Sequence, residues 1–522
     1  MKYNNIIFLF LSIIVVSIPF ILPVYYGSDD VRYIYLISGV YTGEQCTNTI
    51  FMGVLLGEFV AWLYRIYNNI EWYSVVLYAC HYLSYATILC GILYGKTQRA
   101  VKLGLIAAVT AIQIHLSLTP QHTLLSSSLA FASLTAVINT RRNRLYGIIA
   151  VVLFLLSLEY RFKAAFIPFI ICLPLLCLYF LKYKQLRKTY ATILIALTCV
   201  TALSYFFSRH GYSDGEWRDF REYNGARGYL ADNRLAQFHA TTMHNTEDSI
   251  AYELFYRYRI FDKNILTKEK ILSYKHFYEK NVIDSIRFNK NEYTGYFCAN
   301  GFIFSAVILF FSLLWSVTHR KKASTLTIIG STILFIMCVI QMASTSFPKE
   351  RVLLCSMVSV LLVALESNRK DLRFFIPATL ATCLYFTWFY SSRVYDDYIR
   401  TTSPHEDVAE VESMLNKYEE GRVMLPVPTA LVPEAFNTHG SPIGKKGIIQ
   451  GWLHIYPLAP KKYQKFTVFT ETGMPLLTKK SATEQIPIIQ QLLLLHYKQQ
   501  TLVDTLEESP NYLLLRIRKT GN

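Results

Sequence analysis

Residues 6–30 read IIFLFLSIIVVSIPFILPVYYGSDD, an apolar run that ends in two adjacent carboxylates. A helix needs about 20 mainly apolar residues to cross the hydrocarbon core of a membrane, and this run supplies them. Lys2 precedes the run, but no small-x-small cleavage site follows it. We therefore predict an uncleaved first membrane span rather than a signal peptide. Asp29 and Asp30 then stand where the chain leaves the membrane.

The composition of the whole chain agrees with a membrane protein. Of its 522 residues, 52% are hydrophobic and only 17% are charged, whereas about a quarter is charged in an average soluble protein. A net charge of +16 would suggest nucleic acid as the partner of a soluble chain. The apolar content indicates a lipid bilayer instead, so we predict no nucleic-acid partner.

Eleven apolar runs are long enough, or nearly so, to cross a membrane. They cover residues 6–24, 73–95, 102–119, 121–139, 145–159, 165–181, 189–207, 299–317, 325–342, 350–366 and 372–390. Lysine and arginine mark cytoplasmic loops, and they cluster here in five loops that begin at Lys96, Arg141, Lys182, Arg320 and Arg369. We predict an α-helical polytopic membrane protein of about 11 transmembrane helices, with a cytoplasmic N-terminus. Nearly all of the net charge is then an orientation signal.

The apolar stretch 48–67 is not counted among these spans. If it crossed the membrane once, all five basic clusters would move to the outer side. Glu58 near its middle also disfavours a crossing, because a carboxylate in hydrocarbon is costly. The stretch is therefore a re-entrant segment, a helix lying at the interface, or a pair of short helices that returns to the same side.

This topology divides the chain into two domains. Residues 1–390 form a transmembrane domain whose first external loop is 25–72 and whose large external loop, 208–298, is expected to be helical. Residues 391–522 form a small extracytoplasmic α/β domain, entered through a linker. We expect an amphipathic helix over 405–419, a strand from Arg422, a helix over 486–497 and a strand over 512–518. Recognition or chemistry is expected on the external face.

The adjacent carboxylates Asp29 and Asp30 are the first candidates for chemistry. In an extended stretch their side chains point in opposite directions, so one would face the site and the other a supporting partner. Carboxylates at the membrane surface act as a general base or hold a divalent cation such as Mg or Mn. The alternative is a polar stop after a span, with no chemical role.

Several short pieces accompany this pair in the sequence: Ser38–Gly43, Leu63–Tyr64, Glu71–Tyr73, Pro120–Thr123, Glu216–Trp217, Asn224–Arg227 and Asp232. With the first span, the acidic pair, the non-crossing segment and the alternating spans, the chain resembles the GT-C superfamily of polytopic glycosyltransferases, and in particular bacterial GT-C-like membrane proteins. It lacks the WWDYG motif of oligosaccharyltransferases, which argues against en bloc transfer to asparagine.

The resemblance implies an inverting transfer from a polyprenyl-phosphate-linked sugar donor, in the bacterial cytoplasmic membrane. Asp29 or Asp30 would take the proton of the acceptor hydroxyl. The phosphate of the leaving group needs a cation, and arginine suits phosphate geometrically. Candidates in short external turns are Arg161, Lys163 and Arg351, and the alternative for them is local ion pairing with Glu159 and Glu350.

The external loop offers candidates for binding the substrate. Trp217 suits stacking on a sugar face, although it suits anchoring at the interface equally well. Asn224, Arg227 and Asp232 follow on the same segment, and the alternative for Asn224 and Asp232 is helix capping. Gln121, which belongs to the piece before one span, completes the predicted set of substrate-binding residues.

The resemblance implies a membrane glycosyltransferase that acts on a cell-envelope glycan, lipid or protein acceptor outside the cytoplasmic membrane. A flippase or transporter of lipid-linked glycans is the first alternative, but it would need ionisable residues deep inside several spans. A polysaccharide polymerase and a purely structural membrane protein are the others.

Overall fold

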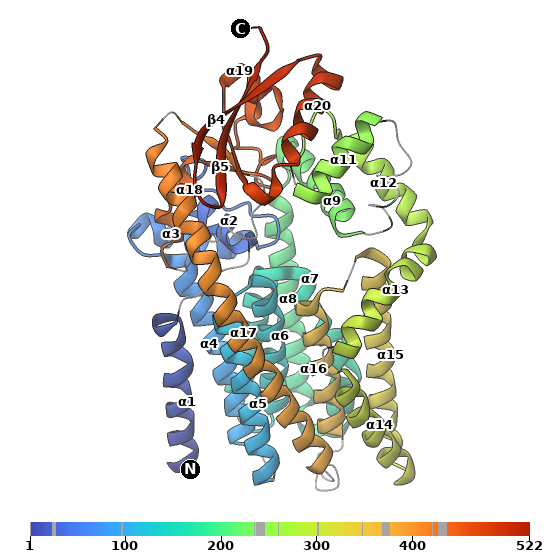
Figure 1. Cartoon of the computed structure of the whole chain (residues 1–522). Coiled ribbons are helices and arrows are strands. Elements are labelled where there is room, and N and C mark those ends of the chain that lie inside the picture. The colour runs from blue at the N-terminus through green and yellow to red at the C-terminus, as the bar shows by residue number, and fades with distance from the viewer. Residues whose placement is uncertain are drawn as a thin grey trace.

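The computed structural model describes residues 2–22, 28–95, 98–233, 235, 238, 246–258, 260–299, 302–346, 348–367, 376–419, 421–425 and 436–521. Long helices form a bundle, and shorter helices and a small sheet form a cap at one of its ends (Figure 1). The N-terminus lies at the end of the bundle away from the cap, and the C-terminus lies at the top of the cap (Figure 1).

The bundle is built from the apolar helices of the chain. They are α1 (Lys2–Ile21), α4 (Trp72–Leu93), α5 (Arg99–Leu118), α6 (His122–Asn139), α7 (Leu145–Lys182), α8 (Arg187–His210), α14 (Phe302–Thr318), α15 (Lys322–Thr345), α16 (Glu350–Ser367) and the first part of α17 (Ile376–Lys417). Among the described residues, six helices are long and apolar enough to cross a membrane. The number of eleven spans and the sidedness of the termini stay predictions.

Helix α7 contains two antiparallel segments that meet at Arg161. The backbone leaves the helical region there, with φ −161° and ψ 95°. The rings of Phe154 and Phe169 have centroids 4.4 Å apart, whereas 15 residues of straight helix would separate them by about 22 Å. The chain therefore reverses direction between them, as the separate apolar runs 145–159 and 165–181 predict.

The non-crossing segment contains one helix, α3 (Val54–Ile66), which is too short to cross a membrane. Its 13 residues span about 20 Å against a hydrocarbon core of about 30 Å. One face buries Val60 and Tyr64, and the opposite face exposes Phe59 and Trp62. Of the three alternatives left open by the sequence, an amphipathic helix lying at the interface fits this pattern.

The buried carboxylate of Glu159 holds α3 in place. It accepts hydrogen bonds from the backbone N–H of Leu56 at 3.1 Å and from the Ser204 hydroxyl at 2.6 Å. The backbone N–H of Gly53 donates to the Glu159 carbonyl at 2.6 Å. The expected alternative of a local ion pair between Glu159 and Arg161 is therefore wrong, because this carboxylate is engaged by α3 and α8.

The cap begins with α2 (Ser28–Ile37) and continues with the large external loop. That loop is helical where it is described, as expected, and contains α9 (Gly215–Asp232), α11 (Thr246–Tyr258), α12 (Lys268–Lys280) and α13 (Val282–Ala299). Helix α13 leads from the cap back to the bundle (Figure 1).

The rest of the cap is a five-stranded sheet with flanking helices. The strand order is β2-β1-β3-β5-β4, in which β1 pairs parallel with β2 and β3, and β5 pairs antiparallel with β3 and β4. The strands are β1 (Val423–Leu425), β2 (Gly447–Ile449), β3 (Leu476–Lys479), β4 (Thr501–Glu508) and β5 (Tyr512–Lys519), and the helices are α18 (Pro442–Lys446), α19 (Thr467–Thr472) and α20 (Gln485–Tyr497).

The expected linker after the last span is wrong. Helix α17 runs unbroken from Ile376 to Lys417, so the predicted span 372–390 and the predicted helix 405–419 belong to one element. Val408, Val411 and Leu415 are buried in the core of the cap, as their helical spacing predicts. The bundle and the cap are therefore joined by a continuous helix.

Replacing Gly53 with alanine tests the anchoring of α3. A Cβ at Gly53 would overlap the Glu159 carboxylate, so Gly53→Ala is expected to displace buried hydrogen bonds and to cost about 1–3 kcal/mol of stability. The measurement is the thermal unfolding midpoint of the purified protein in detergent. Gly225→Ala is the matched control, because a Cβ there meets no atom within 4 Å. An equal effect of both substitutions would contradict this account.

Candidate functional site

Asp29 and Asp30 lie in the first turn of α2, so the expected extended conformation is wrong. Successive side chains of a helix point about 100° apart, and the two carboxylates diverge for that reason. The Asp30 side chain is fully buried, whereas the Asp29 side chain is 23% exposed. Only Asp29 is therefore open to contact with a substrate.

The Asp29 carboxylate is held between the bundle and the cap. Its Oδ1 accepts hydrogen bonds from Arg32 Nη1 at 3.1 Å and from Trp452 Nε1 at 2.9 Å. Burial by itself would raise its pKa, but Arg32, His122, the Trp452 hydrogen bond and Arg161 together lower the pKa to about 2. Asp29 is therefore ionised at neutral pH.

The Asp30 carboxylate is satisfied entirely by its neighbours. Its Oδ1 accepts from the Tyr73 hydroxyl at 2.6 Å and from the backbone N–H of His122 at 3.1 Å, and its Oδ2 lies 3.1 Å from His122 Nδ1. A buried carboxylate is tolerated when its oxygens are paired in this way. Asp30 therefore fixes the position of His122.

The His122 ring connects the acidic pair with Arg161. His122 Nδ1 faces the Asp30 carboxylate, which accepts its proton in a hydrogen bond. Thr123 Oγ1, the Tyr33 hydroxyl and Arg161 Nη1 lie 3.2, 3.4 and 3.4 Å from Nε2, and each can donate.

Arg161 is positioned by the reversal in α7. The Ser126 hydroxyl donates to the Arg161 carbonyl at 3.0 Å, where the helix is interrupted. The guanidinium carbon lies 3.8 Å from the ring centroid of Phe51, a cation–π contact. The same Phe51 ring is parallel to the His122 ring at 6.4 Å. The half-buried guanidinium is thus held beside His122 with a defined orientation.

The other predicted phosphate-binding and loop residues are less closely tied to this network. Gln121 is half-buried and directly precedes His122, whereas Lys163 is exposed two residues after Arg161. Arg351 lies near the start of α16, and its side chain is outside the described part of the chain. The structure therefore brings Asp29, Asp30 and Arg161 together with Gln121 next to them.

The predicted residues of α9 contact the rest of the cap, one another and the turn before α16. Trp217 packs edge-on against Tyr456 with ring centroids 5.1 Å apart, and Tyr456 in turn contacts Trp452 at 6.3 Å. Arg227 Nε donates to Asn224 Oδ1 at 3.0 Å, and Asp232 pairs with Lys349. Trp217 is thus linked to Asp29 through two aromatic rings.

Another buried carboxylate, Glu71, fastens the cap to the bundle. Its Oε2 accepts from the backbone N–H of His439 at 3.0 Å and lies 2.7 Å from His439 Nδ1, while the Tyr64 hydroxyl donates to its other oxygen. Tyr64 and Glu71 belong to two of the short sequence stretches on which the resemblance rests. In the structure they lie next to Tyr73, whose hydroxyl donates to Asp30.

Two residues that contact the site were not predicted from the sequence. Trp452 and Phe51 stand in stretches without a recognisable motif, and Trp452 is 423 positions away from Asp29. Nothing local in the sequence indicates either contact. His122 and Tyr73 do lie in the pieces quoted for the resemblance, although no role was assigned to them.

The residues around Asp29 and Asp30 do not form a cation site of their own. No group of three or more His, Cys, Asp or Glu side chains that could hold a metal occurs among the described residues. Asp30 is occupied by Tyr73 and His122, and Asp29 Oδ1 by Arg32 and Trp452. A divalent cation stays a prediction, and at Asp29 it would need oxygen ligands from substrate and water.

Comparison with solved structures finds two crystal structures of ArnT from Cupriavidus metallidurans, one bound to undecaprenyl phosphate and one in the apo state. Their TM-scores are 0.42 and 0.44, at 11% sequence identity in each case. Each match covers 98% of this chain and 97% of that chain. No family model and no curated protein sequence matches the chain.

The Glu71–His439 contact makes the stability of the protein depend on pH. The hydrogen bond that His439 Nδ1–H donates to the Glu71 carboxylate raises the pKa of His439. Its stabilising effect is therefore complete below the unfolded pKa of about 6.5 and is lost as pH rises through the higher folded value. We expect the thermal midpoint, followed from about pH 5.5 to about pH 8.5, to lose a component over this range.

Glu71→Gln should remove that pH-dependent component, because the neutral amide no longer favours the charged imidazole. Tyr64→Phe is the control, since it deletes a neutral donor to Glu71 and leaves the charge pair intact. A wild-type midpoint whose pH dependence is the same as that of Glu71→Gln would show that the pair does not contribute.

Proposed function

We propose that the protein is a membrane glycosyltransferase that moves a sugar from a polyprenyl-phosphate donor to a cell-envelope acceptor at the cap end of the bundle. One observation carries the proposal. An ionised, partly exposed carboxylate, Asp29, and an oriented arginine, Arg161, are held by the same buried network at the end of the apolar helices. Sugar transfer from a lipid phosphate needs a base for the acceptor hydroxyl and a cation for the donor phosphate, both close to the membrane surface.

Arg161 is the proposed clamp for the donor phosphate. Its guanidinium is always charged and offers N–H groups in a planar fork that matches phosphate oxygens. Stacking on Phe51 and the contact with His122 Nε2 fix the fork before the donor arrives. An oriented cation stabilises the charge that develops on the leaving phosphate without first having to reorganise.

Asp29 is the proposed general base. As the acceptor hydroxyl oxygen bonds to the anomeric carbon, its proton passes to Asp29, and the bond from that carbon to the phosphate oxygen breaks. The electron pair of that bond leaves with the polyprenyl phosphate, whose new negative charge faces Arg161. Attack opposite the leaving group inverts the anomeric configuration. Asp30 is a positioning residue in this scheme, because its buried oxygens are occupied.

The low pKa of Asp29 fits a base that works only when the donor is bound. The same cations that lower this pKa, Arg32 and Arg161, would be shared with the donor phosphate. A bound phosphate offsets their charge and therefore raises the pKa of Asp29 towards the range in which a carboxylate accepts a proton more readily.

Substitution of Asp29 is the direct test of the proposal. The full chain would be reconstituted in liposomes with an envelope lipid extract that contains polyprenyl-phosphate sugars, together with an envelope fraction as acceptor. The readout is the release of polyprenyl phosphate by mass spectrometry. We expect Asp29→Asn to lower turnover about 10²–10⁴-fold in protein that remains folded in detergent.

Asp30→Asn provides the contrast, because it alters a buried hydrogen-bond network. This variant is expected to lower both the unfolding midpoint and turnover. Undiminished turnover in folded Asp29→Asn would overturn the assignment of the base. Movement of lipid-linked sugar across the liposome membrane without release of polyprenyl phosphate would instead indicate a transporter.

Substitution of Arg161 tests the phosphate clamp. Losing a charged, oriented hydrogen-bond donor costs about 1.5–3 kcal/mol, or roughly 10–100-fold in affinity. We expect Arg161→Gln to weaken the binding of undecaprenyl phosphate by this factor, and Arg161→Lys to recover part of it. Lys163→Gln is the control for a nearby positive charge outside the network, and an equal loss in this variant would refute an oriented clamp. Binding is measured by native mass spectrometry.

A further inference from the structure

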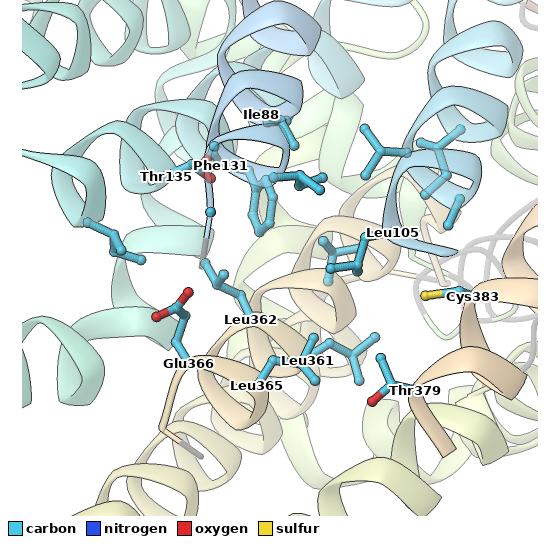
Figure 2. A pocket seen from close by; sticks show the side chains of 18 of the residues that line it. Ile88, Leu105, Phe131, Thr135, Leu361, Leu362, Leu365, Glu366, Thr379 and Cys383 are labelled. Atoms are coloured by element: carbon cyan, nitrogen blue, oxygen red, sulfur yellow. The ribbon is translucent and has the colours of Figure 1, made fainter. Parts of the chain in front are cut away.

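A cavity of about 200 Å³ lies inside the bundle, far from the site described above. Helices α4, α5, α6, α16 and α17 surround it, and its wall consists mainly of apolar side chains. Figure 2 shows Ile88 and Phe131 on one side, and Leu361, Leu362 and Leu365 on the other. A water molecule needs two to four polar partners, so this wall suits hydrocarbon better than water.

The cavity is long rather than compact. A smaller cavity of about 80 Å³ adjoins it, and Ile88, Val109, Ile112, Phe131 and Val358 line both. Along α6 the lining reaches from Asn139 to Leu124, about 22 Å at the rise of a helix. This is more than half of the hydrocarbon thickness of about 30 Å, a length that fits one lipid chain.

The end of the cavity away from the cap carries a positive charge. Arg142 lines it and is exposed, and its side chain has no hydrogen-bond or ion-pair partner within the described parts of the chain. The neighbouring carboxylate of Glu366 accepts from the Tyr179 hydroxyl at 2.5 Å and lies 3.8 Å from Arg141. Among the described residues, Arg141 lies against Glu366, so Arg142 leaves this end with a positive charge that complements an anionic headgroup.

We propose that this cavity binds one acyl chain of an anionic phospholipid, whose phosphate binds Arg142. Basic pockets between membrane helices recognise anionic headgroups in this way. The site is separate from the proposed donor site, because α6 places about 25 Å of helix between His122 and Asn139. One phosphate cannot contact both Arg161 and Arg142. The proposal does not depend on the glycosyltransferase assignment.

The end of the cavity nearer the cap has a polar lining, which disfavours the polyprenyl tail of the donor as the bound lipid. Gln113, Ser127 and Ser128 line the smaller cavity on the side nearer the cap. The Ser128 hydroxyl is hydrogen-bonded to Ser84 at 2.6 Å, and the Gln113 side chain to Ser117 at 3.3 Å. A polar lining at this end suits a lipid tail less well than the apolar interior does, so the cavity is matched to a lipid whose headgroup lies at the Arg142 end.

Native mass spectrometry of the full chain in detergent tests the proposal with phosphatidylglycerol and phosphatidylcholine as probes. The wild-type protein is expected to retain one phosphatidylglycerol at least about tenfold more tightly than phosphatidylcholine. Arg142→Gln should remove this preference, and Arg144→Gln, an exposed neighbour that does not line the cavity, should keep it. Ala108→Leu narrows the cavity and should weaken the binding of both lipids.

Three results would overturn the proposal. They are equal binding of the two lipids by the wild-type protein, an unchanged preference in Arg142→Gln, and displacement of phosphatidylglycerol by undecaprenyl phosphate. The last would assign the cavity to the donor tail. Asp29→Asn should retain the lipid whatever its turnover, so failure here is distinguishable from failure of the proposed function.

Discussion

The burial of the Asp30 carboxylate is the constraint on which the cap end of the molecule depends. A charge without solvent is tolerated only when each oxygen is paired, and losing one partner is costly. The partners come from two other helices, because Tyr73 belongs to α4 and His122 to α6. The first turn of α2 is thereby fixed to the bundle, and the outward direction of Asp29 follows from the helical step between the two residues.

The cap completes the site rather than merely covering it. Trp452 donates to Asp29, the carbonyl of Gln450 accepts from Arg32, and His439 contacts Glu71. Close packing adds to these contacts, since a Cβ at Gly444 would lie 2.6 Å from the Tyr35 ring. The site thus spans the boundary predicted at residue 390, and α17 connects its two sides without a break. A cap that moved away would leave Asp29 without one of its two donors.

The bundle helices could be predicted because a membrane admits helices whose length and apolar content are visible in the sequence. Short strands such as β2, with three residues, leave no alternating pattern to find. The acidic pair was found from its place after the first span, but its helical conformation was not, since serine and aspartate favour turns and caps as readily as a helix. Trp452 could not be found, because a contact between positions 423 residues apart leaves no local pattern.

The charges around Asp29 imply an order of events if the proposed function holds. With Arg32, His122 and Arg161 nearby, the Asp29 carboxylate with its pKa of about 2 accepts protons poorly before the donor binds. The donor phosphate both occupies the clamp and offsets these charges, so the base gains strength only when a sugar is in place. An acceptor that arrived first would meet a weak base. Because water could also attack once the base is active, the acceptor has to fill the space beside Asp29, which Trp452 and the cap border. The cap is therefore expected to determine which acceptor reacts.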